Sequence, residues 1–265
     1  MKFYLTLILV YLNTLNYAQG ISVSPSRIFF KGEVGQTVSQ VISFSNASTS
    51  EFYFVANIKD WDRDSLGVKQ YYPMGQREQS NGSWLSLSDN TIALAPGETK
   101  SVNLSITIPK NSRPQELTNS MLFFTQVKEQ KDQLQHGVNM NILLEIGIQV
   151  YHTPNGMMPG DLEFLAFEDK GMSTKEANQQ VRKMLVKIKN TGQINKDAYV
   201  RFELTNIESG EEIPVKSIAV AMLPHAEQWI ELNLPATLKG RYLAVAILDA
   251  GTQYDLKIAE KEITY

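Results

Sequence analysis

The 265-residue sequence contains no cysteine and only three histidines. The absence of cysteine excludes disulfides, thiolate metal sites and a lipidated cysteine behind a leader. His136, His152 and His225 lie far apart, and the carboxylates near two of them, Asp132 and Glu227, belong to no larger group of ligands. The GxSxG, phosphate-loop and HExxH motifs are also absent. We therefore expect no metal site, no cofactor and no enzymatic activity.

An excess of basic residues is missing too. The chain has 25 Lys and Arg against 28 Asp and Glu, a formal net charge of -3 and a pI near 5.7. Because polyanions are bound by concentrated basic surfaces, we expect no nucleic acid partner. Beyond the first residues no segment approaches the roughly 20 apolar residues of a membrane-spanning helix, so no transmembrane segment is expected in the mature chain.

The first 19 residues have the layout of a secretory signal peptide. Lys2 precedes an apolar run over residues 3–12, and the small residue Ala18 precedes Gln19. The run is too short to span a bilayer comfortably. This pattern predicts a soluble mature chain that begins near Gln19 or Gly20 and is located in the periplasm or at the cell surface.

After the leader, short runs of β-branched and aromatic residues alternate with turn signals such as KGEVGQ, SNGS and APGE. This pattern predicts an all-β protein built from sandwiches rather than from βαβ units. The prolines and glycines of HTPNGMMPGD, residues 152–161, interrupt the strands and indicate a domain boundary. We expect two immunoglobulin-like β-sandwich domains in series, over residues 20–153 and 154–265.

The stretch NMNILLEIGIQVYHTP, residues 139–154, has the longest alternation of apolar residues. Side chains at alternate positions of a strand point to the same face, so one face here is apolar over six positions. A sandwich strand usually needs only three or four inward residues. The strand either fills the protein's own core or offers part of its apolar face to another chain. The six residues are Met140, Ile142, Leu144, Ile146, Ile148 and Val150.

The segment DWDRDSLG places Asp60, Asp62 and Asp64 at alternate positions, as in a calcium-binding loop. An EF-hand loop also needs Gly at its sixth position and Glu at its twelfth, where this chain has Ser65 and Tyr71. We interpret the segment as the solvated end of a hairpin.

The N-terminal half resembles the first domain of the periplasmic pilus-assembly chaperones of the chaperone–usher pathway. SPSRIFFKGEVGQ is similar to that family's first strand, VISFSNAS to its second, and LAPGETKSVNLSI to its proline-glycine turn and following strand. NSMLFFTQV resembles the strand before the long loop, and ILLEIGIQVYHTP resembles the last strand of the domain.

This resemblance implies that the last strand completes the sheet of an unfinished subunit by strand addition. It implies a protein-subunit client, an outer-membrane usher as a further partner, and Arg27 as the cation that holds the client's terminal carboxylate. In the family the second cation is a lysine, and this chain has Gln149 at that position. The Gln149 amide can donate a hydrogen bond but carries no charge. The implied client-binding residues are Arg27, Ile142, Leu144, Ile146, Ile148 and Gln149. Of these, we expect Ile146 and Ile148 to be offered to the client.

Alternatives stay open at each point. The strand over residues 140–150 is otherwise an ordinary core strand, and Arg27 an outward residue of an alternating strand. The second half, with RKMLVKIKNTG and LKGRYLAVAILDAG, is closer to the accessory immunoglobulin-like domains of cell-surface proteins. The alternative function is a structural cell-surface module that binds a cell-wall polymer or a partner protein.

Overall fold

The computed structural model describes residues 20–112, 116–127, 130–133, 139–175 and 178–265. The expected signal peptide and His136 lie outside these residues. Within them the chain forms strands and the short 3-10 turn η1 (Gly82–Trp84), so the all-β class is confirmed. None of the helical segments in this described part is long and apolar enough to cross a membrane.

Two compact units make up the chain. Unit 1 holds residues 1–60, 73–112 and 119–152, and unit 2 holds residues 61–72, 113–118 and 153–265. The last division lies one residue from the boundary that the sequence indicates. The sequence gives no sign that residues 61–72 and 113–118 belong with the second unit.

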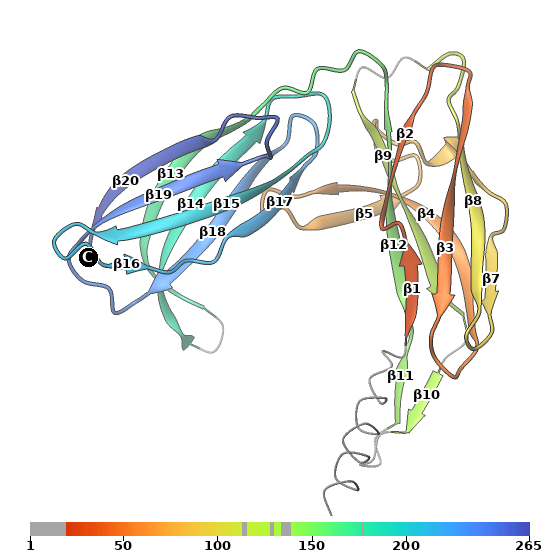
Figure 1. The fold of residues 1–265 in the computed structure, drawn as a ribbon, viewed down its shortest axis with the longest axis horizontal. Helices are drawn as coiled ribbons and strands as arrows, with labels where there is room; N and C mark the ends of the chain where they lie inside the picture. Colours follow the sequence, from red (N-terminus) through yellow and green to blue (C-terminus); the bar gives the residue numbers. More distant parts are fainter. Residues whose placement is uncertain (1–19, 113–115, 128–129, 134–138, 176–177) are drawn as a thin grey trace, which may run out of the picture. The chain divides into compact units, whose positions relative to one another are not determined.

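Unit 1 is a sandwich of two sheets (Figure 1). One sheet has the order β1-β3-β8-β6, and the other has the order β2-β12-β9-β4-β5, with β7 also paired to β4. These orders correspond to the ABED and CFG sheets of the immunoglobulin fold, as expected. The strands are β1 (Ile21–Ser24), β2 (Arg27–Lys31), β3 (Thr37–Asn46), β4 (Phe52–Arg63), β5 (Lys69–Pro73), β6 (Leu85–Leu87), β7 (Thr91–Leu94), β8 (Thr99–Thr107), β9 (Thr118–Gln126) and β12 (Glu145–Thr153). Residues 61–63 of β4 and 69–72 of β5 lie in the part of the chain assigned to unit 2.

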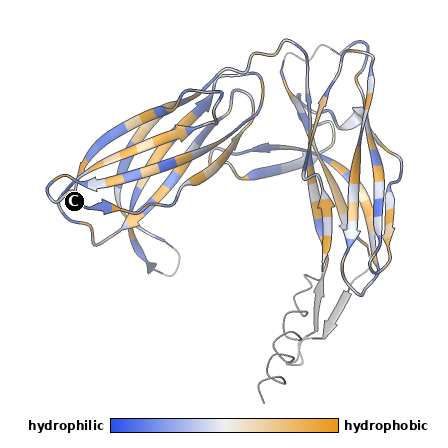
Figure 2. Ribbon diagram, in the orientation of Figure 1, coloured by the Kyte–Doolittle hydropathy of each residue, from blue (hydrophilic) through white to orange (hydrophobic). Residues whose placement is uncertain are grey.

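The core of unit 1 lies between these two sheets. Figure 2 shows apolar and polar residues as alternating bands along the strands, and the apolar residues that are buried form one core cluster. Phe44 and Phe124 meet edge to face across the layers, with ring centroids 4.7 Å apart. A separate hairpin, β10 (Gln130–Gln133) and β11 (Asn139–Ile142), pairs Gln130 with Ile142.

Unit 2 repeats the architecture with its own core. One sheet has the order β13-β14-β18, and the other has the order β16-β15-β19-β20, with β17 paired to β15. This is again an ABE sheet on a CFG sheet. The strands are β13 (Leu162–Thr174), β14 (Gln180–Asn190), β15 (Lys196–Asn206), β16 (Glu212–Ile213), β17 (Ile218–Met222), β18 (Glu227–Pro235), β19 (Arg241–Asp249) and β20 (Lys257–Thr264).

Candidate functional site

Strands β2 and β12 lie side by side at the edge of the unit 1 sandwich. The Gln149 N–H donates to the Ser26 carbonyl at 3.1 Å, and the Phe29 ring stacks on Tyr151 with centroids 5.0 Å apart. From the first contact to the second, the residue number increases on both strands, so β2 and β12 run parallel. In a parallel ladder, the hydrogen bond from the Gln149 N–H to the Ser26 carbonyl places Gln149 opposite the next residue, Arg27. The two residues that the resemblance implies as an anchor are therefore neighbours on one face of the sheet.

This polar pair lies on the outer face of its sheet. Arg27 is half-buried, and Gln149 is 8% exposed. The Tyr151 hydroxyl donates to Gln149 Oε1 at 2.6 Å. The acceptor atom of Gln149 is thereby engaged, and its amide NH₂ group is the donor that it brings to the site.

The inner face of β12 shows a gradient of burial. Ile148 and Val150, 1% and 0% exposed, belong to the core cluster, whereas Leu144 and Ile146 are only partly buried at its margin. The Ile148 side chain is enclosed between the two sheets, so of the two residues that we expect to be offered to a client only Ile146 lies at the margin of the core. The backbone of Ile142 lies in β11, and its side chain is outside the described part.

The expected single strand over residues 140–150 is interrupted at Leu143 and Leu144. At the interruption a side chain takes part in the pairing: Gln126 Oε1 accepts from the Leu144 N–H at 3.1 Å, while the Gln126 N–H donates to the Leu144 carbonyl at 2.8 Å. Leu144 therefore bonds a side-chain oxygen in place of a backbone carbonyl. The ladder resumes at Glu145, whose carboxylate accepts from the Thr125 hydroxyl at 2.8 Å.

One edge of β12 is open over its first half. The strand beside it, β2, begins only at Arg27, and the preceding strand β1 pairs with β3 in the opposite sheet. Among the described residues no strand accompanies residues 145–148 on the β2 side. The partly buried Ile21 and Val23 of β1 and the margin residues of β12 pack against the same core cluster. This open edge, residues 144–148, therefore combines a strand side that no described strand covers with apolar side chains at the margin of the core. Sequence patterns alone did not single out Ile21 or Val23.

The three aspartates of the possible calcium loop do not form a site. Asp60 is buried and accepts from the Arg77 N–H at 2.8 Å and the Ser80 hydroxyl at 2.5 Å. Asp62 accepts from the Tyr72 hydroxyl, and Asp64 accepts from backbone N–H groups of its own turn. The backbone N–H groups of this turn lower the pKa of the Asp64 carboxyl. The described residues include no group of three potential metal ligands.

Comparisons with known proteins give similarities of fold. No protein-family model matches the chain, and no curated protein matches it. The Acinetobacter baumannii complex of a chaperone and a tip adhesion subunit, from archaic chaperone–usher Csu pili, is 11% identical over 91% of this chain and 97% of that chain, with a TM-score of 0.48. The Pseudomonas aeruginosa CupB2 chaperone is 10% identical over 91% and 99%, with a TM-score of 0.46. The Salmonella enterica SafA pilin in complex with the SafB chaperone gives 12% identity over 94% and 98%, with a TM-score of 0.45. These proteins are of the group that the sequence resembles.

Proposed function

We propose that this protein is a periplasmic, non-enzymatic chaperone that binds subunits of a pilus or another envelope assembly by β-strand addition. The observation that carries the proposal is the open edge of β12 at residues 144–148. There, the side of β12 that faces away from β9 has no partner strand among the described residues, and the core covers the adjacent apolar side chains only in part. An exposed apolar edge is an aggregation hazard unless a partner covers it.

A client strand would extend the sheet at this edge. Its backbone would bond to residues 145–148, and its apolar side chains would pack on Leu144 and Ile146 from one side and on Ile21 and Val23 from the other. Burial of apolar area supplies the affinity, and the backbone bonds fix the register. Ile148 and Val150 support this surface from within the core.

The client's terminal carboxylate would lie on the Arg27 and Gln149 pair. Arg27 supplies a charge-assisted hydrogen bond, and the Gln149 amide supplies a neutral one because its oxygen is engaged by Tyr151. The anchor therefore has one cation, and its binding depends more strongly on Arg27 than a two-cation site would.

Co-expression with pilus or envelope subunits of the same cell tests the proposal. Ile146→Asp places a charge at the margin and is expected to reduce the subunit recovered with the protein to background. The matched control is Val41→Asp, because Val41 is an apolar residue of unit 1, 54% exposed, on β3 of the other sheet. Equal recovery with Ile146→Asp and the wild type would overturn strand addition at β12. Constitutive binding to cell-wall polymer without any subunit would support the surface-module function instead.

A further inference from the structure

The two units differ at one edge of the sandwich. In unit 1, β6 covers the outer side of β8, with Leu85 opposite Ile106 and Leu87 opposite Leu104. The corresponding strand of unit 2, β18, pairs with β14 on one side, and none of the described strands pairs with its other side. Strand β17, which precedes β18 in the chain, does not cover this side of β18, because it pairs with β15 in the opposite sheet.

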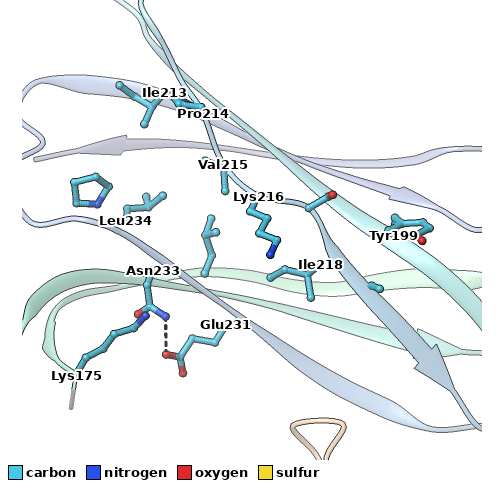
Figure 3. A pocket seen from close by; sticks show the side chains of 14 residues that line it. Lys175, Tyr199, Ile213, Pro214, Val215, Lys216, Ile218, Glu231, Asn233 and Leu234 are labelled. Carbon is cyan, nitrogen blue, oxygen red and sulfur yellow. Dashed lines mark hydrogen bonds between the residues drawn. The ribbon is translucent and has the colours of Figure 1, made fainter. Parts of the chain in front are cut away.

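A groove of about 770 Å³ lies along this uncovered side of β18. Its opposite wall is the segment over residues 214–217, which leaves the sheet between β16 and β17. The groove is lined by apolar side chains and two lysines, and Figure 3 shows Lys216 extending from the far wall into the space in front of β18. The apolar lining includes Ile213, Val215, Ile218, Leu232 and Leu234.

The backbone of β18 presents bonding groups to this groove. The Trp229 N–H points away from β14 and donates to the Ser65 carbonyl at 2.7 Å, where residues 61–72 belong to unit 2. Because orientation alternates along a strand, the N–H groups of Glu231 and Asn233 point to the same side. The edge thus already bonds a turn residue, Ser65, at Trp229, and no described strand pairs with it beyond that point.

The side chains of the groove indicate the chemistry of its occupant. The carboxylate of Glu231 is engaged by Lys183 at 2.7 Å and by the Asn233 amide at 3.0 Å, and Lys175 also attracts it. Lys216 is the second lysine of the lining. Asn233 Oδ1 is buried and has no hydrogen-bond partner in the structure, so a donor from an occupant would satisfy it. Positive charge over an apolar floor complements an apolar segment with a carboxylate.

We propose that unit 2 binds an extended peptide segment along β18, with apolar residues at alternate positions and an acidic residue beside Lys216. The segment takes the place that β6 occupies in unit 1. This site is separate from the open edge of β12, and it does not depend on the function proposed for that edge.

The chain itself supplies a suitable probe. Residues 84–90, WLSLSDN, contain β6 with its two leucines at alternate positions and Asp89 after them. A fluorescently labelled synthetic peptide of this sequence is titrated with the full-length protein, and its anisotropy is measured. We expect saturable binding, weakened about tenfold by Lys216→Glu and by a peptide with Asn in place of Asp89.

The controls locate the binding. Lys239→Glu, at an exposed lysine of the same unit outside the groove, is expected to leave the affinity unchanged, and thermal unfolding confirms that each variant folds. Absence of binding, or equal affinity of the wild type and Lys216→Glu, would overturn the proposal. So would loss of binding with Ile146→Asp alone, because the peptide would then occupy β12. Self-association that Lys216→Glu abolishes would assign the groove to a second copy of the chain.

Discussion

At the scale of single residues, two buried asparagines hold the same place in the two units. Asn46 ends β3, and its Nδ2 group donates to the carbonyls of Ser50, Leu94 and Ala95. Asn190 ends β14, and its Nδ2 group donates to the carbonyls of Ile194 and Leu223. Each side chain therefore ties the end of one strand to the connection that follows and to a second strand or turn.

Replacing Asn46 by Ala leaves these buried carbonyls without their donor. Unsatisfied buried polar groups cost about 1–3 kcal/mol, so we expect Asn46→Ala to lower the free energy of unfolding by roughly that amount. Urea unfolding measures the change. Asn103→Ala, at an exposed position of β8, is the control and is expected to change stability by less than about 0.5 kcal/mol. Equal effects of both changes would show that the Asn46 bonds contribute little.

His152 gives the stability of unit 1 a dependence on pH. It is buried beside Trp84, and its Nε2 atom lies 3.3 Å from the Gly32 carbonyl. Burial is the main cause that lowers the pKa of His152 below its usual value of 6.5. As the pH falls below 6.5 the unfolded chain takes up a proton before the folded one, so stability decreases until the pH reaches the lowered folded pKa.

The matched variant is His152→Gln, which is neutral at every pH. We expect the stability of the wild type relative to His152→Gln to be greater at pH 7.5 than at pH 5.5 in urea unfolding. His225→Asn, at an exposed histidine, keeps His152 and is expected to keep the pH dependence of the wild type. A constant difference between wild type and His152→Gln across this range would contradict the assignment.

At the scale of elements, β12 combines core and margin positions that substitution separates. Ile148→Asp buries an unpaired charge and is expected to destabilise the fold by at least about 3 kcal/mol. Ile146→Asp places its charge where the side chain is only partly buried, so its cost is expected to be clearly smaller. Thermal and urea unfolding compare the two variants. Equal destabilisation would mean that the margin is part of the core and would remove the basis for an offered edge.

The alternation of apolar residues predicted this strand and its inner face correctly, because inward and outward positions follow from a period of two. It did not predict the interruption at Leu144, where the backbone N–H bonds the side chain of Gln126 from another strand. Nor did it separate Ile146 from Ile148. That difference arises because the neighbouring chain changes sheets between β1 and β2, so only the second half of β12 is covered.

The pairing of Arg27 with Gln149 came from resemblance and not from any periodicity, since residues 122 positions apart carry no local signal. The groove beside β18 was not predicted at all. It depends on residues 218–222 joining β15 rather than β18, and apolar strands of this kind fit either sheet.

At the scale of the whole molecule, each unit has a separate apolar core, and the chain has no cysteine to cross-link either one. Stability therefore rests on burial and backbone pairing in both units. We expect the same melting temperature with and without reductant, and with and without EDTA, because the carboxylates that could bind calcium are engaged by the protein's own N–H and hydroxyl groups. Scanning calorimetry on the full chain measures all four conditions. A lower melting temperature in EDTA that added calcium restores would contradict this, and loss of that response in Asp62→Asn or Asp64→Asn would place the ion at the end of β4.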